Sequence, residues 1–179
     1  IAATLRQSLF LNSILWNIET WYDLKESEIN ELEKIDKMLL KRILSVPSTT
    51  PSALLYLEMG IIPLRYVIQA RRLMFLRYIL TRKDNDLLLK FFQAQLREPS
   101  KNDWVTTILK DLEDFELEDN FSTIKKYSKA VWLKKVKEAC KKKSFEDLIE
   151  KKESYSKGES LPYGELTMRS YMKSNCLNA

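Results

Sequence analysis

The scarcity of glycine is the feature that most constrains the fold of this chain. Only three of its 179 residues are glycine, Gly60, Gly158 and Gly164, and no two of them have the spacing of a loop that cradles a phosphate group. Nucleotide-binding folds of the Rossmann and P-loop kinds are therefore excluded. Abundant leucine, lysine and glutamate favour helices over most of the length.

Apolar residues recur at helical spacing almost everywhere, and the sustained alternation typical of strands is absent. The pattern predicts an all-α fold: an irregular multi-helix bundle with no sheet, built on an N-terminal antiparallel αα-hairpin. The expected helices cover residues 3–21, 24–44, 51–60, 63–82, 86–96, 101–118, 128–143 and 144–154.

The predicted hairpin consists of the first two helices. In the first helix one face carries Leu5, Leu9, Asn12, Trp16 and Glu19. In the second, the predicted apolar face is Ile29, Leu32, Ile35, Leu39 and Ile43. Asp23, with Glu26 three residues later, matches a capping box and predicts the start of the second helix.

A change in composition near residues 98–101 predicts a domain boundary, because the chain before it is more apolar and the chain after it more charged. We expect a helical domain over residues 1–98, a charged helical subdomain over 99–154 and a poorly ordered polar tail over 155–179. The chain opens on isoleucine and has no closing motif, so we expect it to be a piece of something longer.

Few residues could carry catalysis. The chain contains no histidine, which excludes Ser-His-Asp triads, Cys-His dyads and histidine-ligated metals. Cys140 and Cys176 lie far apart and predict neither a zinc site nor a disulfide framework, and Cys140 is expected as a small buried thiol. The acidic run at 111–119 lacks the hydrophobic setting that would raise a pKa. We expect no catalytic residue, no metal and no cofactor in this segment.

The overall charge is mildly basic, with 30 lysines and arginines against 25 acidic residues and a sequence pI of about 9.1. Such a balance permits contact with nucleic acid without requiring it. Arginines interrupt the most apolar stretch, at 61–80, so we expect no membrane span. No small-molecule substrate is expected either.

Positive charge is concentrated on particular helical faces. Lys34, Lys37 and Lys41 share one side of the second helix, and Lys134, Lys137 and Lys141 share one side of a later helix. Between residues 125 and 143 there are nine lysines and one acidic residue. This density suits repeated contacts with phosphate groups. The predicted nucleic-acid-binding residues are Lys34, Lys37, Lys41, Arg65, Arg72, Lys134, Lys135, Lys137, Lys141 and Lys142.

Each of these stripes also has a simpler interpretation. The lysines could form a solvated surface that keeps the protein soluble. Arg65 and Arg72 lie near each other on a mostly buried helix, where some arginines are expected to pair with carboxylates such as Glu58. Tryptophans such as Trp16 could stack on bases, but aromatic residues at helical spacing usually belong to the core.

Several segments resemble one protein family in the order in which they occur along the chain. They are ILWNIETWYDL at 14–24 and INELEKIDKMLLKRIL at 29–44, then YLEMG at 56–60, PLR at 63–65, RRLMFLRYIL at 71–80 and FFQAQLREPSKNDW at 91–104. This succession is similar to the region that follows the palm in reverse transcriptases of non-LTR (LINE-like) retrotransposons. It covers most of residues 1–150.

The resemblance implies a thumb-like helical region whose parent polyprotein is an RNA-directed DNA polymerase. In that family this part grips the template–primer duplex by its backbone, and Lys34, Lys37 and Lys41 would belong to the duplex-facing helix. The partners implied are an RNA–DNA or RNA duplex and the missing palm and fingers. Catalytic magnesium would belong to that palm, and the implied location is intracellular, in nucleus and cytoplasm. The cysteine/histidine knuckle found downstream in the family has no counterpart in this sequence, and Cys176 alone cannot replace it.

Two functions therefore stand side by side. The first is a non-catalytic helical module that binds nucleic acid without sequence specificity. The second is a helical protein-interaction or scaffold domain with no nucleic-acid contact, whose apolar first helix packs against a partner.

Overall fold

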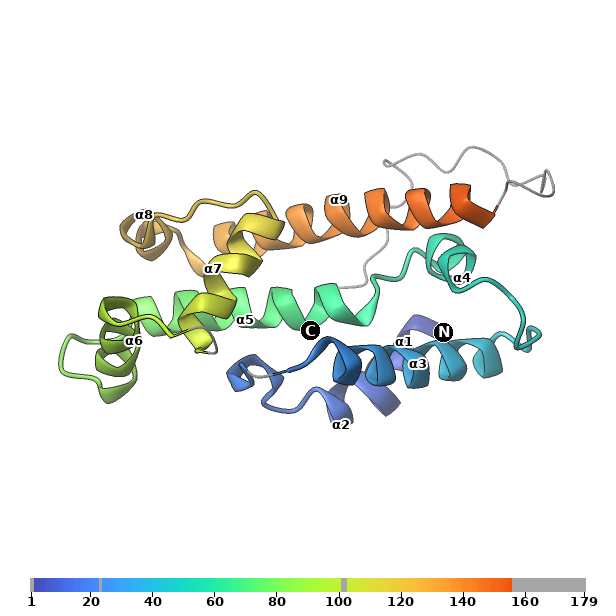
Figure 1. Cartoon of the computed structure of the whole chain (residues 1–179), viewed down its shortest axis with the longest axis horizontal. Coiled ribbons are helices and arrows are strands. Elements are labelled where there is room, and N and C mark those ends of the chain that lie inside the picture. The colour runs from blue at the N-terminus through green and yellow to red at the C-terminus, as the bar shows by residue number, and fades with distance from the viewer. Residues whose placement is uncertain (1, 23, 101–102, 156–179) are drawn as a thin grey trace. The chain divides into compact units, whose positions relative to one another are not determined.

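The structure is a computed structural model, and it describes residues 2–22, 24–100 and 103–155. Its helices are α1 (Ala2–Leu5), the π-helical turn η1 (Arg6–Leu11), α2 (Asn12–Ile14), the 3₁₀ turn η2 (Ile18–Thr20), α3 (Glu26–Ile43), α4 (Ser52–Met59), α5 (Leu64–Leu80), α6 (Leu87–Arg97), α7 (Trp104–Asp114), α8 (Phe121–Lys126) and α9 (Lys129–Tyr155) (Figure 1). No strand occurs within the described ranges, so the predicted all-α class is confirmed.

The chain forms two compact units. Among the described residues, unit 1 consists of 2–16, 26–67 and 141–155, and unit 2 of 17–22, 24–25, 68–100 and 103–140. Helices α5 and α9 each contribute residues to both. Along the chain the units change after residues 16, 25, 67 and 140, and none of these positions is near the domain boundary expected at residues 98–101. Contacts within unit 2 cross it, since the Trp104 ring packs edge-on against Phe75 and Phe92, with centroids 5.7 and 6.2 Å away. A change in surface charge does not mark where such packing ends.

In unit 1 the N-terminal segment and α3 run in opposite directions, as the hairpin prediction requires (Figure 1). A buried ion pair joins them: the Arg6 guanidinium donates to both carboxylate oxygens of Asp36, each over 2.6 Å. The Tyr56 hydroxyl donates to the same carboxylate over 3.0 Å. This polar contact fixes how the two helices pack.

The helix expected over residues 3–21 ends early, at Ile14. Asn17 takes the left-handed conformation, with φ at 61°, which breaks the helix before the short turn η2. The second helix, expected over 24–44, is observed as Glu26–Ile43. The capping box predicted at Asp23 lies outside the described residues.

The buried face of α3 differs from the predicted apolar face. The buried side chains are Glu33, Asp36 and Leu40. Of the predicted face, Ile35 is exposed, and the other members, Ile29, Leu32, Leu39 and Ile43, are half-buried. The difference has a physical cause, because cationic partners from other helices neutralise the two acids. Arg6 pairs with Asp36, and Arg65 donates to Glu33 over 2.9 Å. These pairs allow α3 to bury two carboxylates, which apolar periodicity alone does not predict.

Helices α4 and α5 follow the sequence prediction closely. Gly60 ends α4 in the left-handed conformation, with φ at 59°, and α5 begins directly after Pro63. Pro51 occupies the N-cap position of α4 and forms no side-chain capping hydrogen bond. No single described helix is long and apolar enough to cross a membrane, and only α4 and α5 taken together, with a bend between them, pass that test.

Unit 2 is organised around buried residues of α5, α7 and α9, among them Leu73, Ile108 and Trp132. Asp86 caps α6 and Asp103 caps α7, each accepting a backbone N–H of the first turn. Helix α8, which the sequence pattern did not predict, is capped by Asn120 and anchored by the buried Ile124.

Helix α9 runs unbroken through the position where a second helix was expected to start. The Ser144 hydroxyl is buried and donates to the Lys141 carbonyl oxygen over 3.1 Å, so it lies inside the helix instead of capping a new one. Cys140 is a buried thiol on this helix, as predicted.

Candidate nucleic-acid interface

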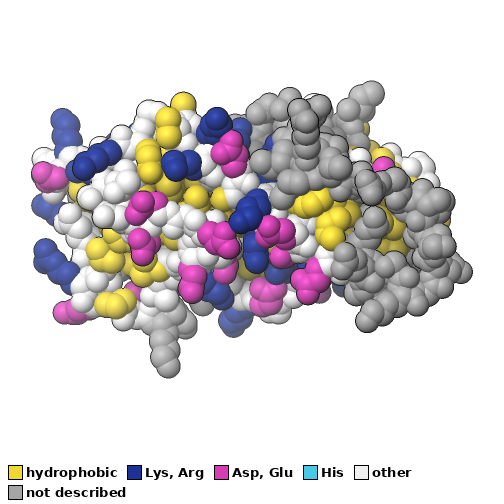
Figure 2. Space-filling view, turned by 90° about the horizontal axis from the view of Figure 1, so that it is seen from above, with side chains coloured by type: hydrophobic (Ala, Val, Ile, Leu, Met, Phe, Trp, Pro, Cys, Tyr) yellow, Lys and Arg dark blue, Asp and Glu magenta, His cyan; other side chains and the backbone are white. Residues whose placement is uncertain are grey.

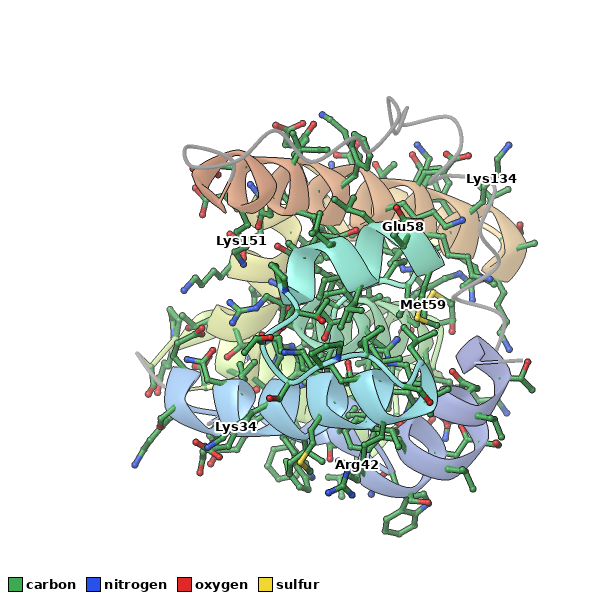
Figure 3. All side chains as sticks on the ribbon, turned by 90° about the vertical axis from the view of Figure 1, so that its right-hand side faces the viewer. Lys34, Arg42, Glu58, Met59, Lys134 and Lys151 are labelled. Carbon is green, nitrogen blue, oxygen red and sulfur yellow. The ribbon has the colours of Figure 1, made fainter. Side chains whose placement is uncertain are left out.

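A group of exposed lysines in unit 2 lies where α8 leads into α9. We define the α8–α9 lysine cluster as the exposed side chains of Lys125, Lys126, Lys129, Lys134 and Lys135. All five belong to unit 2. Figure 2, which looks down on α8 and α9, shows dark-blue Lys and Arg side chains at the left-hand end of that face. Figure 3 shows Lys134 projecting outward from α9.

The backbone beneath the cluster is held by α5. Arg77 donates to the Tyr127 carbonyl oxygen over 2.9 Å, and the Trp132 indole Nε1 donates to the Leu73 carbonyl oxygen over 2.9 Å. The Tyr127 ring stacks on Trp132, with centroids 6.0 Å apart and planes at 14°. The connection between the two helices is thus fixed at three points, and the lysines project from a backbone that is already positioned.

The start of α9 adds two further restraints. The Ser128 hydroxyl oxygen accepts the Val131 backbone N–H over 3.2 Å and caps the helix. The Lys135 ammonium lies 5.1 Å from the centroid of the Tyr127 ring, which is a cation–π contact. It leaves the ammonium available to an anion on its other side.

Few acidic groups offset this charge. No acidic residue occurs between Lys125 and Lys137 in the sequence. Within the described ranges, Lys125, Lys126 and Lys129 form no ion pair, and Lys134 has only a long, exposed contact of 3.9 Å with Glu138. Lysines concentrated on one short segment repel one another, and a polyanion would relieve the repulsion. The cluster is therefore suited to contacting a chain of phosphate groups.

The predicted stripe on α3 is in a different electrostatic setting. Lys37 donates to Glu33 over 3.1 Å, Lys34 lies 3.6 Å from Glu31, and Lys41 donates to the Ser48 carbonyl oxygen. The helix carries five acidic and four basic side chains: Glu26, Glu28, Glu31, Glu33 and Asp36 against Lys34, Lys37, Lys41 and Arg42. This nearly neutral helix offers much less to a polyanion than the α8–α9 lysine cluster does.

Arg65 is engaged in unit 1. Its guanidinium contacts Glu26 and Glu33, each over 2.9 Å, and Asn30 over 3.0 Å. Burial alone would raise the pKa of Glu33, but hydrogen bonds and charge from Arg65 and Lys37 bring it below its ordinary value. The sequence suggested pairing of arginines with carboxylates such as Glu58, and for Arg65 the observed partners are Glu26 and Glu33.

Arg72 is buried within unit 2, where it donates to both carboxylate oxygens of Asp111 over 2.6 and 2.8 Å. Gln69 donates to the same carboxylate over 3.1 Å. Burial raises the pKa of Asp111, and the nearby Arg72 opposes that shift. A predicted contact of Arg72 with nucleic acid does not fit this placement, because the guanidinium is enclosed by the core and occupied by Asp111.

The three other predicted residues lie along α9. Lys137, in unit 2, is half-exposed; in unit 1 Lys141 is half-exposed and Lys142 exposed. The ten predicted residues are thus divided between the two units. Lys125, Lys126 and Lys129 were not among them, although the count of nine lysines over residues 125–143 pointed to their segment. The sequence did not predict α8, the short helix that carries Lys125 and Lys126.

In the part of the chain that the structure describes, no group of three or more acidic or cysteine side chains could hold a metal ion. The chain was also compared with known proteins. No protein-family model matches it, and no curated protein or solved structure is detectably similar to it.

Proposed function

We propose that this chain is a non-catalytic helical module that binds the phosphate backbone of a nucleic-acid duplex without sequence specificity. The observation that carries the proposal is the α8–α9 lysine cluster, with five exposed lysines on an ordered connection and no acidic residue among them in sequence. Lysine ammonium groups bind phosphates as point charges and do not by themselves read base edges.

The resemblance to the post-palm region of non-LTR retrotransposon reverse transcriptases supports an RNA–DNA duplex as the ligand. On this proposal, polymerisation by the parent protein would depend on a palm and its magnesium outside this segment. The duplex-facing surface would be the α8–α9 lysine cluster in place of the α3 stripe, since the α3 lysines already have partners within the protein.

The test is a fluorescence-anisotropy titration of a labelled RNA–DNA duplex at several salt concentrations. The variant changes Lys125, Lys126 and Lys129 to Gln. Its matched control changes Lys83, Lys90 and Lys110 to Gln, three exposed lysines of the same unit. Each lost phosphate contact lowers the slope of log affinity against log salt by about 0.9, so the cluster variant should lose about 2–3 units and the control less than about 1.

An equal loss of slope in both variants would mean that only net charge matters. Absence of binding at low salt would exclude the function for this chain.

A helical scaffold domain is the second candidate. The observation that favours it is the exposure of apolar side chains on the N-terminal segment, among them Trp16, which is 76% exposed.

A further inference from the structure

The outward face of α3 carries a seam of residues with the spacing of a coiled coil. Its members follow one another at alternating intervals of three and four residues, which keeps them on one side of a helix. They are Glu28, Glu31, Ile35, Met38 and Arg42. All five are exposed, with Ile35 at 42% and Met38 at 49%. The seam is opposite the side that buries Glu33, Asp36 and Leu40 in unit 1.

The order of charges along this seam is self-complementary. Its N-terminal end is acidic, its centre is apolar and its C-terminal end is basic. If a second α3 lies antiparallel, about a two-fold axis between Ile35 and Met38, Glu31 of each copy faces Arg42 of the other. In the same arrangement Ile35 of each copy faces Met38 of the other. In a parallel arrangement like charges would face each other at both ends.

The two charged side chains that form the proposed intermolecular pair, Glu31 and Arg42, are available for this contact. Arg42 forms no ion pair within the described ranges, and the contact between Glu31 and Lys34 is a long surface pair of 3.6 Å between largely exposed side chains. In Figure 3 both Lys34 and Arg42 project outward from α3. Forming an intermolecular pair would therefore break no buried interaction.

Unit 1 also exposes apolar side chains on its N-terminal segment. Leu5, Leu9 and Trp16 are 38%, 64% and 76% exposed. The one charged side chain between residues 2 and 16 is Arg6, which is buried against Asp36. A surface with no exposed charge can lie against its own copy without repulsion. It offers no cation to an anionic lipid surface or a polyanion.

We propose that the α3 seam is a self-association surface, which binds the α3 seam of a second copy of this chain in antiparallel orientation. The proposal is independent of nucleic-acid binding, because the seam and the α8–α9 lysine cluster lie in different units. The seam is only about 21 Å long, from 14 steps of 1.5 Å, so the dimer is expected to be weak and reversible.

The test is sedimentation-equilibrium ultracentrifugation of the full chain, from low micromolar to a few hundred micromolar. Three variants are compared: Glu31→Arg, Arg42→Glu and the double reversal. Each single reversal places like charges opposite each other at two symmetry-related points, and should raise the dimer dissociation constant by about tenfold. The double reversal restores opposite charges and should return the constant to within about threefold of the parent.

Glu146→Arg and Lys90→Glu are the matched controls, since both residues are exposed helix positions outside the seam. They should leave the dissociation constant unchanged. A chain that stays monomeric over the whole range would overturn the proposal and leave this face to another protein or to a lipid surface. A dimer that ignores the single reversals, or that the double reversal does not restore, would also overturn it, because self-association would then use another surface or orientation. Circular dichroism of each variant shows whether its helices remain intact.

Discussion

Trp132 on α9 donates a hydrogen bond from its indole nitrogen to the carbonyl oxygen of Leu73 on α5, over 2.9 Å, between two fully buried residues. This bond ties the first turn of α9 to α5 within unit 2. The α8–α9 lysine cluster therefore depends, for its position, on a side chain that has no charge and no access to solvent.

Replacing Trp132 with Phe should lower the free energy of unfolding by about 1–2 kcal/mol, because the ring is partly retained but the hydrogen bond to Leu73 is lost. Urea denaturation followed by circular dichroism measures the change. Trp16→Phe is the control, since that residue is largely exposed, and its effect should stay below about 0.5 kcal/mol. Equal effects of the two substitutions would contradict a structural role for the indole N–H.

Lys129→Glu should raise stability by about 0.5 kcal/mol and at the same time weaken binding to an RNA–DNA duplex. Lys129 is exposed in the first turn of α9, where the helix dipole disfavours a positive charge and favours a negative one. Thermal denaturation and the anisotropy titration measure the two effects. Loss of stability in this variant would show that Lys129 has a structural partner.

Glu33 predicts a loss of stability in acid. Its pKa is lowered in the folded state, so its ionised form contributes stability above its ordinary pKa of 4.5, and this contribution is lost as the pH falls below that value. Glu33→Gln should be less stable than the parent by about 2 kcal/mol at pH 7, because hydrogen bonds to a charged acceptor are lost. The difference should shrink as the pH falls below 4.5 and Glu33 becomes protonated in the parent. Denaturant titrations of both proteins from pH 3 to 7 measure it.

Breaking the Arg72–Asp111 pair should be costly, whereas replacing both partners should not be. Arg72→Met leaves a buried carboxylate unpaired, which should cost about 3–5 kcal/mol. The double variant with Asp111→Leu should recover most of that loss. Chemical denaturation of the two single variants and the double variant completes the cycle. A double variant as unstable as Arg72→Met would mean that the pair itself contributes strongly.

Gly60→Ala should cost about 1 kcal/mol, because an alanine side chain disfavours the left-handed conformation that ends α4. Gly60→Asn should cost less, since asparagine tolerates that conformation better. Melting temperatures of the two variants rank them. If alanine were tolerated as well as asparagine, the backbone at residue 60 would not require a positive φ.

Local sequence signals predicted much of the fold. Helical periodicity predicted α3 and α5. Gly60 lies at the predicted end of α4 and Pro63 at the predicted start of α5. Glycine and proline act on the backbone within a few residues, so their effects can be predicted from local sequence. Positions where the prediction differed depend on partners far away in sequence. The buried carboxylate of Glu33 is paired with Arg65, 32 residues later, and that of Asp111 with Arg72, 39 residues earlier. Apolar periodicity contains no information about such pairs.

The candidate interface was predicted only in part. The lysine density of residues 125–143 indicated α9 as a binding surface. The lysines of α3 have the same helical spacing, so the sequence predicted binding there as well. The two differ in their ion pairs: Lys37 is paired with Glu33, whereas Lys125 and Lys126 form no ion pair among the described residues. Distinguishing a neutralised stripe from an unneutralised one requires the positions of the acids.

The buried contact between Arg6 and Asp36 also determines the alignment of the N-terminal segment along α3. Apolar side chains of similar size can slide past one another by a helical turn at little cost. A slip of one turn here would move the guanidinium about 5.4 Å from its carboxylate and leave two unpaired charges away from water. The longitudinal position of these two helices is thus specified by a single charge pair, and any sequence change that neutralises one member makes alternative alignments accessible.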